Sequence, residues 1–413
     1  MKTSIILIFQ DPTIPPSLIR EAQSKLAYLD EAITAAHVSD NGHEIELVLR
    51  GSVDDAHEMR IRENVKVLVR LLCDGGFQLQ LRVVEDHTIA VPHRQDPMPE
   101  LLARREVVQE GPGYFVLGPM MSRLVEFVEA RLLQVADHMH AVPYRFPALI
   151  SPAYLEKVKY FQNFPHSLSF VTHLREDFKI IQKFSSIAAT RDGTVATNET
   201  THATCRAMLS PAVCHHLYFS LSDSEIDSAG LVATASGHCF RYESINMVSL
   251  ERIWNFTMRE IIFVGTDEQT KAWLDEARDR IRTILQDLHL SYRVMTASDP
   301  FFIGVFRTQA QVQQTLEMKF EIHAHLPYKQ DTIAVGSYNH HGNFFGRSLN
   351  IRLAKGPACT GCFGMGFERL AFAFVAQHGL DTGRWPAAVR EALSSNVESV
   401  ERLPTSSRIG LAR

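Results

Sequence analysis

The sequence predicts an α+β fold built from a small N-terminal domain and a larger domain that follows it. The first hundred residues show the order strand, helix, strand, helix, strand. Two long stretches, 120–139 and 267–288, carry apolar residues at helical spacing. Residues 317–323 alternate polar and apolar side chains, which is typical of a half-buried strand. A chain of 413 residues is also long for one domain.

The N-terminal domain is expected at residues 1–92. Its predicted elements are a strand at 4–9, a helix at 16–33, a strand at 44–50, a helix at 53–72 and a strand at 78–85. The sequence Asp74-Gly75-Gly76 should stop the second helix, because glycine commonly follows the last helical residue. Residues 93–113 are rich in proline and glycine and are predicted to be an irregular linker with one short helix.

The larger domain is expected at residues 114–393. The helix at 120–139 has a broad apolar stripe and leads into a strand containing proline at 143–150. The helix at 267–288 is apolar on one side and charged on the other, so it should serve as scaffold. The polar segment 394–413 is predicted to be a poorly ordered tail.

The composition favours a cytoplasmic, water-soluble protein. Apolar residues make up 45% and charged residues 22%, which is ordinary for a globular chain, and no window approaches a membrane span. The N-terminus turns polar too soon for a signal peptide. The six cysteines form no disulfide framework, so some are free to bind metal.

Two segments have the residues that a phosphate ligand needs. Residues 359–370 read CTGCFGMGFERL, where two glycines precede an apolar helix that begins with Arg369. Glycine lets the backbone approach a ligand closely, and arginine can hold phosphate oxygens with two parallel hydrogen bonds. The second segment, FRYE at 240–243 with RIWNFTMRE at 252–260, adds arginines, acids and aromatic rings.

Together these segments resemble motifs 3 and 2 of the class II aminoacyl-tRNA synthetases. More narrowly, residues 113–379 resemble the amino acid:[carrier protein] ligases, which derive from archaeal-type seryl-tRNA synthetases. Phe164-Pro165, Asp299-Pro300-Phe301-Phe302 and Ser337-Tyr338-Asn339 match as well. The resemblance implies a catalytic antiparallel sheet flanked by helices. It also implies that residues 120–150 form motif 1, the interface of a homodimer.

Amino-acid activation joins a carboxylate to the α-phosphate of ATP, so two anions must meet beside cations. The resemblance assigns the α-phosphate and the substrate carboxylate to Arg241. It assigns the adenine amino group to Glu243, two residues further on the same face of an expected strand. Phe256 would stack on adenine, with Arg369 on the other face of the base near the γ-phosphate, and Arg252 would also reach that phosphate. A single arginine would be interpreted as a solvated surface charge. Several residues that match the family in the same order favour an ATP site instead. Arg241 and Arg369 are the expected catalytic residues.

Two further residues take roles from the resemblance. Glu321 would hold Mg2+ on the ATP phosphates, since carboxylate oxygens suit this hard cation. The alternative is a strand carboxylate that faces solvent. Asn339 would lie near the same site and contact the substrate. The histidines nearby are expected to be ordinary polar positions, at residues 323, 325, 340 and 341.

A zinc site is expected from Cys214, Glu260 and Cys362, which are 46 and 102 residues apart. Three protein ligands leave one position open, as in catalytic zinc sites. The resemblance implies that the open position takes the α-amino group of the substrate. Cys359-x-x-Cys362 offers a rival, half of a structural zinc or redox site, but no second pair completes it. The other cysteines, at 73, 205 and 239, are expected to be small buried residues.

The function expected is ATP-dependent activation of glycine or alanine, followed by transfer to the phosphopantetheine thiol of a carrier protein. Residues 1–110 hold 12 Lys and Arg against 18 Asp and Glu, a net charge of −6, which suits tRNA poorly. The carrier-binding surface is expected between residues 154 and 206. Two alternatives remain open. One is aminoacylation of tRNA in the manner of a seryl-tRNA synthetase, and the other is a catalytically silent relative that binds or regulates.

Overall fold

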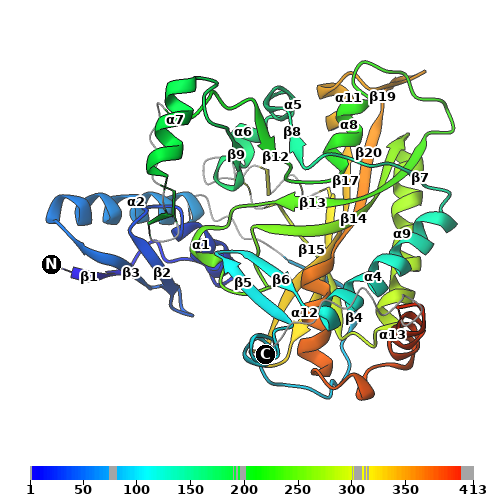
Figure 1. The fold of residues 1–413 in the computed structure, drawn as a ribbon, viewed down its shortest axis with the longest axis horizontal. Helices are drawn as coiled ribbons and strands as arrows, with labels where there is room; N and C mark the ends of the chain where they lie inside the picture. Colours follow the sequence, from blue (N-terminus) through cyan, green and yellow to red (C-terminus); the bar gives the residue numbers. More distant parts are fainter. Residues whose placement is uncertain are drawn as a thin grey trace.

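The computed structural model describes residues 2–73, 81–188, 190–191, 194–195, 201–299, 301, 309–310, 313 and 316–400, and side chains only as far as 393. A three-stranded sheet near the N-terminus stands beside an eight-stranded sheet that is covered by helices (Figure 1). The predicted α+β class is therefore confirmed. Among the described residues, no helix combines the length and the apolar character needed to cross a bilayer.

The N-terminal unit packs two helices on an antiparallel sheet of order β1-β3-β2. Its elements are β1 (Lys2–Ile8), η1 (Pro16–Leu18), α1 (Ile19–Leu26), β2 (Ile33–Val38), β3 (Glu44–Val53) and α2 (Asp55–Cys73). Alternate residues of β3, Ile45, Leu47 and Leu49, enter the core together with Leu68 and Leu72 of α2. The period of two along the strand puts one face inside and leaves the other in solvent.

Two predictions for this unit were wrong. The first helix ends at Leu26, well before residue 33, and β2 was missed. Only the two ends of β2, Ile33 and Val38, are buried, so its sequence lacks the apolar alternation of a strand. The third predicted strand is β4 (Val83–His87), and it pairs with the large sheet instead of the small one. Residues 74–80, which include the predicted helix stop, lie outside the described part.

The large sheet has the order β4-β15-β16-β17-β20-β14-β13-β7. All neighbours are antiparallel except β7, which runs parallel to β13. The strands are β7 (Val142–Pro143), β13 (Leu231–Phe240), β14 (Asn255–Gly265), β15 (Tyr292–Thr296), β16 (Lys319–Leu326), β17 (Asp331–Gly342) and β20 (Cys359–Gly366). The strand predicted at 143–150 is thus two short pieces, β7 and β8 (Leu149–Ile150), in different sheets.

The two faces of this sheet have different neighbours. Ile261 and Phe263 of β14 belong to the core formed with α4 (Pro119–His138), α9 (Asp267–Asp287) and α12 (Phe367–His378). Ile262 and Val264 belong to a second core on the opposite face, with α8 (Cys214–Ser220) and α11 (Phe344–Ser348). Odd-numbered residues of β14 therefore face the long helices, and even-numbered residues face the other side, where the candidate site lies.

The long helices begin where their sequences provide caps. The Thr266 side chain accepts from Gln269 N at 3.2 Å, and Gln269 accepts from Thr266 N at 2.8 Å, which forms a capping box at the start of α9. The Glu106 carboxylate accepts from Met120 N at 2.8 Å in the first turn of α4. Both helices match their predicted ranges within a residue or two.

Shorter elements connect these layers. The segment expected to be a linker holds α3 (Met98–Ala103), as predicted, and also β5 (Val107–Gly111) of a hairpin with β6 (Tyr114–Leu117). Near the end of the chain, α13 (Ala387–Val400) continues into the segment predicted as a tail. The remaining elements are α5 (Pro152–Lys157), α6 (Tyr160–Asn163), η3 (Pro165–Ser167), β9 (Phe170–Val171), α7 (Phe178–Ile187), β10 (Thr190–Arg191), β11 (Thr194–Val195), β12 (Ala207–Leu209), η4 (Ser244–Asn246), β18 (Arg352–Leu353), β19 (Gly356–Pro357) and η5 (Thr382–Arg384).

Candidate active site

The face of the large sheet away from the long helices gathers predicted site residues from four neighbouring strands. Glu260 of β14 lies two residues from the even-numbered Ile262, and Cys362 of β20 pairs with Ile262 on one side and with Asn339 of β17 on the other. Glu321 of β16 pairs with Ser337, two residues before Asn339. Antiparallel pairing therefore brings side chains that are far apart in sequence onto one surface.

Cys214, Glu260 and Cys362 form a buried cluster whose ligand atoms all lie within 4.8 Å of one another. The two sulfurs are 3.9 Å apart. Val213 N and Cys214 N, at the start of α8, each donate to the Glu260 carboxylate at 3.2 Å and so orient it. Gly364 lies opposite Glu260, and a Cβ there would approach Glu260 Cγ to 3.3 Å. Two thiols and a carboxylate at this spacing are a donor set that suits zinc.

The geometry of β20 argues against the alternative metal site, the Cys359-x-x-Cys362 pair. Cys359 and Cys362 lie three residues apart on β20, so their side chains point to opposite faces of the sheet. The charges that influence the Cys359 thiol are Asp267, Glu268 and Lys271 of α9, on the helix-covered face. The Cys-x-x-Cys pair therefore does not converge on one metal.

The ionisable groups of the cluster favour their neutral forms. The pKa of the Cys214 thiol lies well above its usual range because of its contact with Cys362, and because of burial. Burial also raises the pKa of Glu260, although contacts with both thiols oppose this effect. A cation at this position would reverse the balance, since metal ligation requires thiolates.

Arg241 stands just beyond the end of β13, so the strand predicted to contain it stops one residue earlier. Its Nε donates to Pro211 O at 3.0 Å, and its guanidinium lies 5.5 Å from the centre of the Phe256 ring. The positive charge of Arg241 also opposes the rise in the pKa of Glu260 that burial causes. A cation between an aromatic ring and this cluster is suited to an anionic substrate group.

Glu243, Arg252 and Arg369 form one ion network. Arg252 donates to one oxygen of the Glu243 carboxylate at 2.5 Å, and Arg369 of α12 approaches the other at 3.4 Å. Burial opposes ionisation of Glu243, but the two arginines hold its pKa below the usual range. The structure thus joins motif 2 and motif 3 through a single carboxylate.

Glu321 is partly buried and lies between Lys319 and His323. Its side chain is 21% exposed and lies 2.9 Å from Lys319 and 3.2 Å from His323. Burial would raise its pKa, but Lys319 and His323 hold the pKa well below its usual range. Lys319 also pairs with Asp299 at 2.6 Å. Asn339 lies beside Cys362, where its Nδ2 donates to Ser337 Oγ at 2.9 Å and lies 3.5 Å from Cys362 Sγ.

Sequence reasoning missed Lys319 and Tyr160. Lys319 shares the alternating face of Glu321, so the pattern at 317–323 contained a signal for it. Tyr160 is buried, and no local pattern marks it. Burial raises its pKa to about 12, although the positive charge of Arg241 opposes this rise. Pro300 and Phe302 lie outside the described residues.

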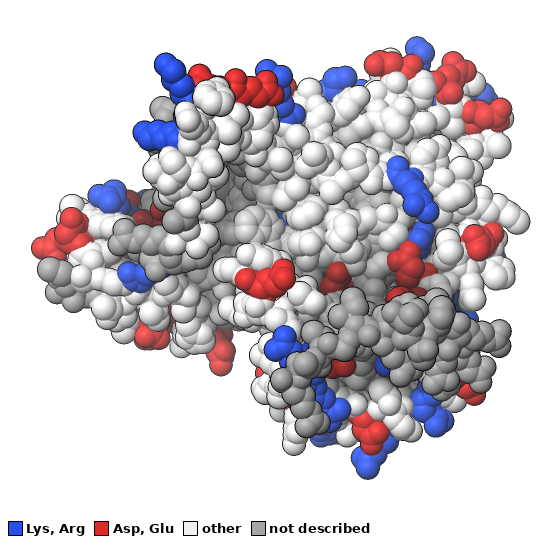
Figure 2. All heavy atoms as spheres, viewed as in Figure 1, with Lys and Arg blue, Asp and Glu red and all other residues white. Residues whose placement is uncertain are grey.

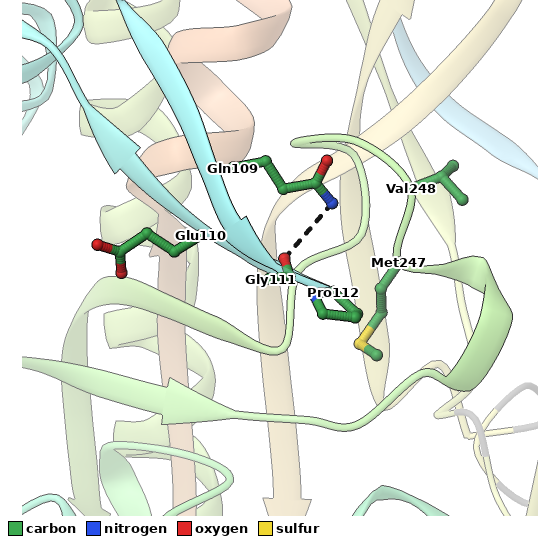
Figure 3. A pocket seen from close by; sticks show the side chains of 6 residues that line it. All are labelled: Gln109, Glu110, Gly111, Pro112, Met247 and Val248. Atoms are coloured by element: carbon green, nitrogen blue, oxygen red, sulfur yellow. Dashed lines mark hydrogen bonds between the residues drawn. The ribbon is translucent and has the colours of Figure 1, made fainter. Parts of the chain in front are cut away.

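A surface pocket lies beside the motif 2 segment but contains none of the predicted site residues (Figure 3). It is lined by the β5–β6 turn, Gln109 to Pro112, and by Met247 and Val248. The turn also holds the backbone that leads into β14, because Trp254 N donates to Gly113 O at 2.6 Å. We therefore regard this pocket as a feature of the scaffold.

Comparison with known proteins identifies close relatives, although no protein-family model matches the chain. Two proteins of Bradyrhizobium diazoefficiens, described as amino acid–[acyl-carrier-protein] ligases 1 and 2, are each 31% identical to it. Both alignments cover 76% of this chain, with 95% and 93% of the respective relative. A type-2 serine–tRNA ligase of Methanopyrus kandleri is 25% identical and covers 95% of this chain and 76% of its own length.

Solved structures show the same fold. The structure of M. kandleri SerRS in complex with A. aeolicus tRNASec matches with a TM-score of 0.65 at 20% identity, over 96% of this chain and 78% of its own. A prolyl-tRNA synthetase of Cryptosporidium parvum gives a TM-score of 0.53 at 13% identity, over 70% and 53%. The architecture is that of a class II synthetase, and the identity and coverage of the sequence relatives show that this chain belongs to the family of amino acid–[acyl-carrier-protein] ligases.

Proposed function

We propose that this protein activates a small amino acid, glycine or alanine, with ATP and passes it to the phosphopantetheine thiol of a carrier protein. The observation that carries the proposal is the buried Cys214, Glu260 and Cys362 cluster, which lies within reach of the Arg241 charge. Family membership supports the ligase activity. The identity of the substrate side chain is an expectation from the resemblance.

In the first step, a carboxylate oxygen of the amino acid attacks the α-phosphorus of ATP, an O–P bond forms, and pyrophosphate leaves with the electron pair of the broken bond. Arg241 would hold the substrate carboxylate and the α-phosphate, so that the two anions approach beside a positive charge. Arg252 and Arg369 would exchange their pairing with Glu243 for contacts to the ATP phosphates. Glu243, once released, could accept from the adenine amino group, while Phe256 stacks on the base.

Two metal ions belong to the proposal. Cys214, Glu260 and Cys362 would hold Zn2+, which would bind the amino group of the substrate at its open position. Glu321 would hold Mg2+ on the ATP phosphates. Lys319 contacts one oxygen of this carboxylate and His323 the other, so the ion would share these oxygens with them or displace one of the two.

In the second step, the thiol of the carrier attacks the carbonyl carbon, a thioester forms, AMP leaves and the thiol proton passes to solvent.

Helix α7 lies in the segment expected to bind the carrier, and in Figure 1 it projects away from the large sheet. It exposes Phe178 at 77%, Ile181 at 46% and, one turn apart, Lys179 and Lys183. Figure 2 shows basic and acidic side chains on this lobe. Carrier proteins are often acidic, so the lysines support α7 as the dock.

The test is ATP–pyrophosphate exchange across the common amino acids, followed by transfer to a panel of holo-carrier proteins. Glycine and alanine should both react, since one methyl group changes discrimination by only ~1–3 kcal/mol. Labelled amino acid should appear on the holo-carrier and not on its apo form. Reversal of the α7 charges, Lys179→Glu with Lys183→Glu, should reduce transfer but not exchange. Lys355→Glu, in the exposed turn between β18 and β19, is the matched control. A protein with no exchange activity would be the catalytically silent relative instead.

Aminoacylation of tRNA is the second candidate, and the N-terminal unit gives the reason. The alignment with the serine–tRNA ligase covers 95% of this chain, so it includes most of that unit, whereas the ligase alignments cover 76%. The net charge of −6 over residues 1–110 argues against a tRNA-binding role for it. Label on tRNA in the same transfer assay would favour the synthetase. We also propose a homodimer formed through α4 and β7, and a cytoplasmic location.

A further inference from the structure

The end of α1 and the turn that follows it, which holds Ala27 and Tyr28, contact the segment that carries Glu243. Tyr28 Oη donates to Tyr242 O at 3.1 Å. In the opposite direction, Ser244 Oγ donates to Ala27 O at 3.1 Å. The two hydrogen bonds therefore attach to the residues immediately before and after Glu243. In Figure 1 the end of β13, which leads into this segment, lies beside the N-terminal unit.

The backbone of this segment needs such support. Ser244 has a φ of 52°, in the left-handed region that residues with a side chain rarely adopt. A conformation of this kind persists only when the surroundings hold it in place. Tyr242 N donates to Ser167 O at 3.1 Å, and Asn246 Nδ2 donates to Ser24 O at 3.4 Å, so α1 holds the segment at a third point.

Helix α1 also contacts Phe301, in a second part of the catalytic domain. Lys25 is 5% exposed and donates to Phe301 O at 2.5 Å, while it pairs with Glu21 at 2.8 Å. Phe301 belongs to the core of the N-terminal unit and stacks on Phe164 at 5.0 Å. The apolar core of the small unit therefore continues into the catalytic domain.

The Tyr28 hydroxyl also lies near the negative charge of Glu243. Tyr28 is half-buried, and its pKa is raised by burial first and then by the negative charge of Glu243. The Tyr28 hydroxyl thus remains a donor over the whole physiological range, next to the carboxylate that pairs with Arg252 and Arg369. A neutral donor at this point fixes the backbone without competing for the two arginines.

We infer that Tyr28 is a positioning residue for the ATP half of the active site. By holding Tyr242 and Ser244, the turn after α1 sets the position of Glu243 and, through it, of the arginines assigned to the ATP phosphates. This inference rests on the proposed role of Glu243 in binding adenine. The N-terminal unit then acts on nucleotide binding, whichever acceptor the enzyme serves.

The test compares Tyr28→Phe and Ser244→Ala in the full chain, because each removes one hydroxyl from this contact. Tyr28→Phe keeps the ring that packs edge-on to His166 at 4.9 Å. Each variant should raise the KM for ATP about 3- to 10-fold in pyrophosphate exchange, the loss expected for one hydrogen bond. The KM for the amino acid should stay within about twofold. Tyr292→Phe is the matched control, since no described residue accepts from the Tyr292 hydroxyl.

An unchanged KM for ATP in both variants would overturn the inference. So would equal increases in both KM values together with a lower melting temperature, which would indicate a merely structural contact. Equilibrium dialysis with labelled ATP and Mg2+ gives the second measurement. If the wild-type protein binds ATP but shows no exchange, the proposed function fails, and the affinities of the variants for ATP still decide the inference.

Discussion

Replacement of Cys362 by serine should abolish zinc binding, whereas replacement of Cys359 should leave it intact. The ligand atoms of Cys214, Glu260 and Cys362 lie within 4.8 Å of one another, while Cys359 points to the opposite face of β20. Zinc present at about 100 times its Kd would stabilise the folded protein by about 2.7 kcal/mol. In a chain of this size, that free energy corresponds to a few degrees in melting temperature.

The assay combines metal analysis with thermal unfolding of the two variants and the wild type, with and without a chelator. Wild type and Cys359→Ser should carry about one zinc per chain and should melt lower after chelation. Cys362→Ser should carry almost none and should not respond to the chelator. The metal should also leave as the pH falls, because the raised pKa of the Cys214 thiol favours protonation. Zinc retained by Cys362→Ser but lost by Cys359→Ser would refute the assignment of ligands.

Three further predictions concern activity, stability and pH. Arg241→Ala should reduce pyrophosphate exchange by roughly 100-fold or more with an unchanged circular dichroism spectrum, since a charge beside two anions is lost. Gln377 is fully buried and bonds Ser291 N and His325 O, each at 2.8 Å, so Gln377→Leu should lower the free energy of unfolding by roughly 2–4 kcal/mol in urea titrations. Burial lowers the pKa of His341 to about 4, so the unfolded chain binds a proton that the folded chain does not. The free energy of unfolding should therefore fall as the pH drops from about 6.5 to about 4, and His341→Gln should flatten this slope by up to ~1.4 kcal/mol per pH unit. An unchanged exchange rate, unfolding curve or slope would contradict the corresponding prediction.

Local patterns predicted the long helices and several strands, but they missed β14, β15, β17 and β20 and did not give the partners of the strands. Helices α4 and α9 follow from their apolar stripes, which are a property of residues that are close in the sequence. The pairing of β4 with β15 depends on residues that are far apart in the chain, and no periodicity records it. Strand β2 was missed because its middle residues are exposed.

In the candidate site as well, the sequence named individual residues but not the contacts among them. The resemblance named Cys214, Glu260 and Cys362 from three separate segments, and the register of β14 with β20 brings the last two together. Their metal remains a prediction. The salt bridges of Lys319 and the burial of Tyr160 depend on tertiary packing, so motif matching alone could not assign them.

The position of β4 at an edge of the large sheet limits where recombination could join the N-terminal unit to the rest of the chain. Strand β4 is the outermost strand of the large sheet, although it precedes the whole catalytic domain in sequence. A recombination event with its breakpoint at residue 92 would separate β4 from β15 and expose a fresh strand edge, which invites association with other chains. A breakpoint between Cys73 and Val83 would transfer the N-terminal unit and leave the sheet whole. A junction between α2 and β4 therefore keeps the large sheet whole, although it would separate Phe301 and Phe164 from the core of the N-terminal unit.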